Sequence, residues 1–253
     1  MQTVMKAIFQ AKKSYARELF FEFLRDGSRS ARDRLAFYPC MAHFILAFGD
    51  LNKYVMRDDG SVDPYQQIVN AHTREDDHHW PWYLEDLAKL GFDGTQSTGD
   101  ILRFLFSDET KVNRMLSTRL AHLIYGATPI ERLVIIEAIE ETGNVLFNLT
   151  ARLAREIEAE SGLTLRYLGD FHLALETGHA MGEGDHAQLL AIELDDAGRQ
   201  RCLALVDEVF ALFREWISEL HAFALAALHE RRGLPRERVA PRVRHAALRS
   251  QLG

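Results

Sequence analysis

The 253-residue chain has only two cysteines, Cys40 and Cys202, and both lie within apolar helical patterns. Two thiols in such positions argue against a disulfide framework, a thiolate metal site and an iron–sulfur cluster. Basic residues are not in excess either, because the formal net charge is -7 and the pI is about 5.9. This charge balance argues against a general nucleic-acid partner, which would require a basic surface.

Long hydrophobic runs are also absent. A membrane span needs roughly 20 apolar residues, and charged residues interrupt the longest apolar stretches, 133–139 and 210–228. The first 13 residues mix lysines with apolar residues and contain no small-residue cleavage site. We therefore expect a cytoplasmic protein without a membrane partner.

Only 6 prolines and 16 glycines punctuate the chain, mostly between long stretches with apolar residues at three- and four-residue spacing. No segment alternates as a strand would. Pro39 should kink the helix that contains it or mark its true start, and Pro81 should bend its helix. The sequence predicts an all-α, single-domain bundle of seven helices in residues 1–232. The predicted helices cover residues 3–25, 31–56, 64–90, 97–125, 128–160, 168–181 and 195–232.

The composition changes at the end of the chain. Residues 231–253 contain seven arginines and a single acidic residue, Glu237. Such a segment is typical of a solvated tail, and we assign residues 233–253 to it. A contact with another subunit or with an anionic ligand is the alternative.

Histidines in register with acidic residues are the most informative feature of the sequence. On the helix predicted over 64–90, His72, Glu75, Asp76 and His79 follow offsets of zero, three, four and seven, which define one helical stripe. These four side chains can therefore converge on one point.

A second stripe lies on the helix predicted over 168–181. His172, Glu176 and His179 follow offsets of zero, four and seven. Facing helices that each present imidazoles and carboxylates are how di-iron and di-manganese sites are built in helical bundles. This ligand chemistry suits iron, manganese or zinc.

A third contribution is expected from the helix predicted over 128–160. Glu137, Glu140 and Glu141 lie in an apolar stretch, where an unpaired buried carboxylate is costly and a partner or a metal is needed. Periodicity does not choose among the three.

Three aromatic residues, Trp80, Trp82 and Tyr83, follow His79 directly. Such residues most often pack in a core, and they also form the walls of substrate pockets. We retain them as candidate pocket residues.

Two of these motifs resemble those of the heme-oxygenase-like dimetal oxidases and oxygenases. This seven-helix superfamily shares its fold with heme oxygenase, the TenA thiaminases and the pyrroloquinoline quinone synthase. The turn from His79 to Leu90-Gly91 resembles the family's ligand histidine and the aromatic and apolar residues after it. The stretch His172-x-x-x-Glu176-x-x-His179 resembles the family's His-x-x-x-Asp-x-x-His motif, with Glu in place of the usual Asp.

The resemblance also ranks the open alternatives. It favours Glu140 as the middle glutamate, with Glu137 second. It favours Glu75 as the glutamate that precedes the histidine, with His72 and Asp76 as alternatives. The ligand set that it implies is Glu75, His79, Glu140, His172, Glu176 and His179.

The resemblance implies a non-heme iron oxidase or oxygenase. One or two irons, or manganese, would activate dioxygen to oxidise a small organic substrate such as an amino acid or fatty acid derivative. The alternatives are a metal-independent TenA-like enzyme and a non-catalytic helical binding or scaffold protein. We also expect a homodimer, because the apolar residues between Val209 and Leu220 exceed a single helical stripe.

Overall fold

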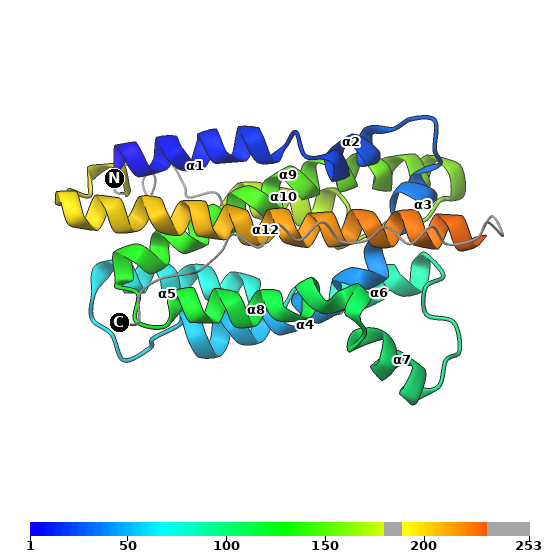
Figure 1. Ribbon diagram of the computed structural model, residues 1–253, viewed down its shortest axis with the longest axis horizontal. Helices are drawn as coiled ribbons and strands as arrows, with labels where there is room; N and C mark the ends of the chain where they lie inside the picture. Colours follow the sequence, from blue (N-terminus) through cyan, green and yellow to red (C-terminus); the bar gives the residue numbers. More distant parts are fainter. Residues whose placement is uncertain (180–188, 232–253) are drawn as a thin grey trace, which may run out of the picture.

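The computed structural model describes residues 1–179 and 189–231, with no side chain described for residues 176–179 (Figure 1). Every regular element in these ranges is a helix, so the all-α prediction is confirmed. No helix among them is long and apolar enough to cross a membrane. The predicted tail, 233–253, lies outside the described residues.

The two longest helices begin and end where the sequence signals place them. Helix α9 (Pro129–Ser161) begins with a capping box in which Thr128 and Glu131 bond each other's backbone, and it ends at Gly162 with a φ of 72°. Helix α12 (Asp196–Arg231) packs along α9, and both cross the length of the molecule (Figure 1). They form the frame around which the shorter helices are arranged.

Four of the predicted helices are interrupted, so the prediction of continuous segments was wrong there. Residues 16–18 separate the two helices of the first segment, and Pro39 lies in a 3₁₀ turn in the second. Pro81 lies in the first turn of a new helix, because proline fits that position and not a helix interior. The observed elements are α1 (Gln2–Tyr15), α2 (Leu19–Arg25), α3 (Ala31–Arg34), a 3₁₀ turn (Tyr38–Met41), α4 (Ala42–Leu51), a π-helical turn (Asn52–Met56), α5 (Pro64–Asp76), α6 (Trp80–Lys89), α7 (Thr98–Leu105), a 3₁₀ turn (Asp108–Thr110), α8 (Lys111–Ile124) and α10 (Asp170–His179).

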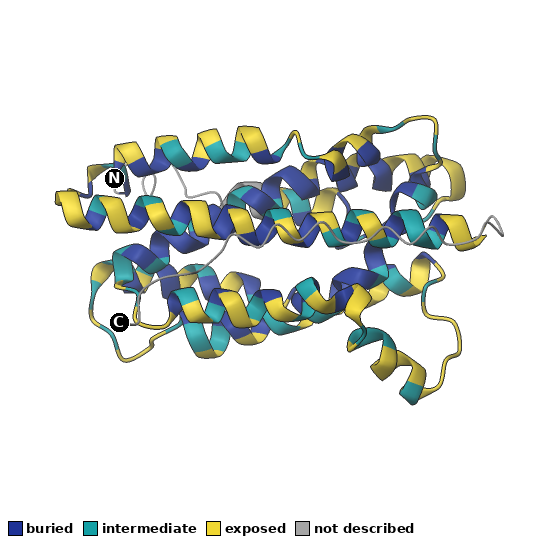
Figure 2. Ribbon diagram, viewed as in Figure 1, coloured by how far each residue is buried: buried dark blue, intermediate teal, exposed yellow. Residues whose placement is uncertain are grey.

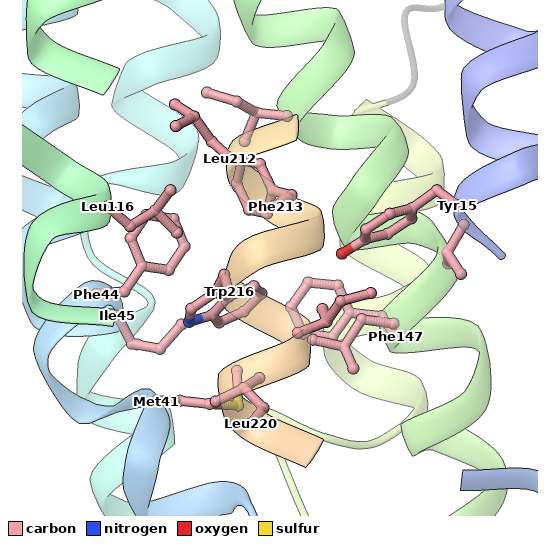
Figure 3. Packing of buried hydrophobic residues seen from close by; sticks show 14 of the residues in the cluster. Tyr15, Met41, Phe44, Ile45, Leu116, Phe147, Leu212, Phe213, Trp216 and Leu220 are labelled. Atoms are coloured by element: carbon pink, nitrogen blue, oxygen red, sulfur yellow. The ribbon is translucent and has the colours of Figure 1, made fainter. Parts of the chain in front are cut away.

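The buried apolar side chains form one cluster that includes residues from Met1 to Leu228. Figure 2 shows that buried residues, in dark blue, occur along helices throughout the bundle. Figure 3 shows its centre, where Trp216 and Phe213 of α12 lie between Phe44 of α4 and Phe147 of α9. The Trp216 indole Nε1 donates to Asn113 Oδ1 of α8 at 3.0 Å, which satisfies its one polar group. The frame and the short helices therefore share one apolar interior.

The same packing removes the reason for expecting a dimer. The residues of α12 that suggested a second apolar face are all buried within the chain, against α1, α8 and α9. These residues are Val209, Phe210, Leu212, Phe213, Trp216, Ile217 and Leu220. The prediction of a homodimer is left without the observation that motivated it.

Candidate metal centre

The junction between α5 and α6 carries the first group of candidate ligands. Arg57 holds it in place, because its guanidinium donates to the Thr73 carbonyl at 2.8 Å and to Asp77 Oδ2 at 2.6 Å. On the other side, a Cβ at Gly49 of α4 would lie 2.9 Å from the Asp77 carbonyl oxygen, so the two backbones touch there. The junction is thus fixed by an ion pair and a close backbone contact.

One imidazole and two carboxylates meet between α5 and α9. His72 Nε2 lies 3.3 Å from Asp76 Oδ2 and 3.3 Å from Glu140 Oε1. One ligand atom from each residue falls within 4.8 Å of the others, which is the spacing of groups that can share a cation. Asp76 is only 4% exposed, so its carboxylate is held away from solvent.

The electrostatics of this group favour positive charge. Burial by itself would lower the pKa of His72, but its hydrogen bonds with Asp76 and Glu140 outweigh burial and raise that pKa well above the usual 6.5. The two carboxylates therefore stabilise either a proton on His72 or a metal cation in its place.

A pair of histidines lies next to this group. His79 precedes α6, His172 belongs to α10, and the distance from His79 Nδ1 to His172 Nε2 is 3.1 Å. The other ring nitrogen of His172, Nδ1, donates to the Tyr167 carbonyl oxygen at 2.9 Å. In the neutral ring this bond leaves Nε2 as the atom with a lone pair, directed toward His79. His172 is thereby held in the tautomer that a metal ligand requires.

Asp86 of α6 supports His172, and sequence reasoning missed it. Its buried carboxylate accepts the backbone N–H groups of Arg166, Tyr167 and Leu168 at 2.8 to 3.0 Å. The segment that carries the Tyr167 carbonyl is thus tied to the helix that follows His79. The available signal was the offset of seven residues from His79, which places Asp86 on the same face of a helix.

Aromatic rings surround the histidine pair. His79 stacks on Trp82 with ring centroids 4.4 Å apart, and Phe147 lies 4.3 Å from His172. Tyr83 is engaged elsewhere, because its hydroxyl donates to the Tyr38 carbonyl at 2.9 Å. Of the three candidate pocket residues, Trp80 is the one that lines a cavity; Trp82 and Tyr83 pack in the interior.

That cavity brings both groups of ligands together. It has a volume of about 60 Å³, and Asp76, Glu140, His79 and His172 all contribute to its wall. The rest of the wall is mostly apolar and aromatic, with Phe44, Leu146, Phe213 and Trp216 among its residues. Within the part of the chain that the structure describes, no lysine or arginine lines it.

No family model and no curated protein matches this chain. The resemblance to the dimetal oxidases therefore stays a prediction. What the site can do has to be argued from its own geometry.

The structure distinguishes the sequence candidates by position. Asp76, predicted as an alternative, is buried with His72 and Glu140, whereas Glu75 is exposed. Glu137 lies close by, and its burial, with the nearby charge of Glu141, raises its pKa to about 7 despite the opposing charge of His72.

The remaining sequence candidates are Glu141, Glu176 and His179. Glu141 forms an ion pair with Lys12 of α1. Glu176 and His179 are in α10, and their side chains lie outside the described residues.

Proposed function

We propose that the chain is a non-heme iron oxidase or oxygenase that uses dioxygen to oxidise a small organic substrate. The observation that carries the proposal is the single cavity reached by two carboxylates and two histidines, with His72 joining the carboxylates at 3.3 Å. Carboxylates and histidines buried together in an apolar bundle lower the stability of the fold unless their charges are balanced there.

The donor set fits the proposed metal. Nitrogen and carboxylate oxygen donors without thiolates suit iron, manganese and zinc. We favour iron because it supplies redox chemistry when bound, and the resemblance of His79 and of the motif at His172 points to the same group. The ligands that we assign are His72, Asp76, Glu140, His79 and His172, with Glu176 and His179 retained from the sequence.

The protein's own residues would then perform three tasks. Asp86 and the Tyr167 carbonyl orient His172, and Arg57 orients the junction that bears Asp76 and His79. The apolar residues of the wall limit the contact of the reacting groups with water. In the metal-free chain Glu137 has a pKa of about 7, so it can take up or release a proton near neutral pH before a metal binds.

A second candidate function follows from the pKa of His72. A protonated His72 between Asp76 and Glu140 is already a balanced ion network, so the same residues can stabilise a non-redox enzyme or a binding protein without metal. Metal binding by the purified protein separates the two readings.

The experiment is an anaerobic titration of the metal-free protein with Fe(II), Mn(II) and Zn(II), followed by elemental analysis after gel filtration. Wild type should retain one or two equivalents, and the variants Asp76→Asn and Glu140→Gln should each bind at least tenfold more weakly. The matched control is Glu75→Gln, which changes the exposed neighbour of Asp76 and should retain metal. Iron-loaded protein should also consume dioxygen with a substrate. Absence of retained metal from folded wild type would contradict the proposal and favour the ion network.

A further inference from the structure

Gly143 occupies an unusual place in the middle of α9. Glycine is the least favourable residue after proline in a helix interior, and this helix has 33 residues. Among the described residues, the glycines with positive φ are Gly91, Gly126 and Gly162, so the backbone at Gly143 does not require glycine. Gly143 lies on the wall of the cavity that Glu140 and His172 share.

Close packing does not require this glycine either. A Cβ at position 143 would meet only the Phe147 ring of the same helix, at 3.5 and 3.7 Å, which is ordinary contact. Gly49, also on the cavity wall, is different, because its Cβ would lie 2.9 Å from the Asp77 carbonyl oxygen. Gly49 is needed for a backbone contact. At Gly143 neither the backbone conformation nor packing requires glycine, so its effect is the space that it leaves open in the cavity.

The wall defines what can use that space. Among the described residues it includes no lysine or arginine, so in the metal-free protein no basic side chain of the wall is a counter-charge for a carboxylate or phosphate. Its acids, Asp76 and Glu140, contact His72, and its two histidines contact each other. Most of its other residues are apolar. At about 60 Å³ the cavity is well below the roughly 150 Å³ of an apolar cavity that binds benzene.

From this geometry we infer that the cavity binds a small, uncharged, apolar group, and that Gly143 sets the size of group admitted. If this group is the reacting end of a substrate, it is a short alkyl terminus that lies beside Glu140 and His172. That assignment rests on the proposed function, but the binding space does not.

Xenon is a suitable probe because it is apolar, uncharged and small. We would measure its dissociation constant by ¹²⁹Xe NMR and locate it in crystals under xenon pressure, for wild type, Gly143→Ala and Gly99→Ala. Gly99 of α7 is a matched control: its Cβ would also meet only side chains at ordinary distances, 3.6 to 3.8 Å, and it does not line the cavity. Wild type and the control should bind xenon at the cavity, and Gly143→Ala should bind at least fivefold more weakly with an equal or higher Tm.

Three results of the xenon experiment would overturn the inference. The first is the absence of xenon from the cavity in wild type, and the second is an unchanged xenon affinity in Gly143→Ala. The third is a lower Tm for Gly143→Ala, because it would show that the glycine is needed for packing. Benzene should leave the Tm of wild type unchanged, and a rise would refute the size limit. Metal retention by Gly143→Ala is measured in parallel. If xenon binds at the cavity but no metal is retained, the proposed function is rejected and the inference about the cavity is not.

Discussion

The raised pKa of Glu137 predicts a specific pH dependence of stability. Its pKa is about 7 in the folded, metal-free chain against an ordinary value of 4.5, so the folded state holds this proton more tightly than the unfolded state. The contribution of the Glu137 proton to the free energy of unfolding is fully present below about pH 4.5, and it is lost as the pH rises to about 7. The shift corresponds to roughly 3 kcal/mol at most, because one pKa unit is worth about 1.4 kcal/mol.

The perturbation is Glu137→Gln, which keeps the shape and removes the titration. The free energies of unfolding of wild type and variant would be measured by urea denaturation in chelator at pH 4.5, 6 and 8. The wild-type value minus the variant value should fall by about 2 to 3 kcal/mol between the first pH and the last. Because His72 and other groups titrate in both proteins, only this difference reports on Glu137.

Glu160→Gln is the control, since Glu160 is an exposed glutamate near the end of the same helix. Its stability profile should run parallel to that of wild type. Adding a metal that binds beside His72 should lower the pKa of Glu137 and reduce the difference, because the added positive charge favours the carboxylate. A difference between wild type and Glu137→Gln that does not change with pH in the metal-free proteins would refute the reasoning.

Three further outcomes are expected. Asp86→Ala should lower the free energy of unfolding by about 3 kcal/mol in urea denaturation, because it leaves buried backbone N–H groups without their acceptor. Asp86→Asn should lose less stability, and equal stability of Asp86→Ala and wild type would contradict this prediction. Gly49→Ala should weaken metal binding in the titration described above, because the added Cβ displaces the α5–α6 junction at Asp77. Unchanged metal affinity would mean that the junction accommodates the Cβ without moving the ligands. Metal affinity should fall as the pH is lowered, because protons compete for His72, and a dissociation constant independent of pH between 5 and 8 would exclude His72 as a ligand.

Local signals in the sequence were enough for the longest helices. Helix α9 follows the predicted start at Thr128-Pro129, where Thr128 and Glu131 form a capping box, and Gly162 ends it in the left-handed conformation. The interruptions were harder to place. Pro81 was expected to bend a helix, but it begins a new one, because whether a chain bends or restarts depends on what packs against the junction, here Arg57 and Gly49.

The interruption also changed the candidate site. With a continuous helix, Glu75 and Asp76 are equivalent members of one stripe that includes His79. In the structure the helix stops at Asp76, and Asp76 is buried while Glu75 is exposed. The offsets that grouped His72 with Asp76 were local and correct, since residues four apart on a helix are neighbours.

The sequence by itself determined the helical class, the limits of the longest helices and the short-range pair of His72 with Asp76, because each depends on residues within a turn or two of each other. Only the tertiary structure decided that Glu140 completes this group, that His79 meets His172 and that Asp86 supports the second histidine. These contacts join residues about 65 to 95 positions apart, and their formation depends on how helices pack, which periodicity within one helix does not encode.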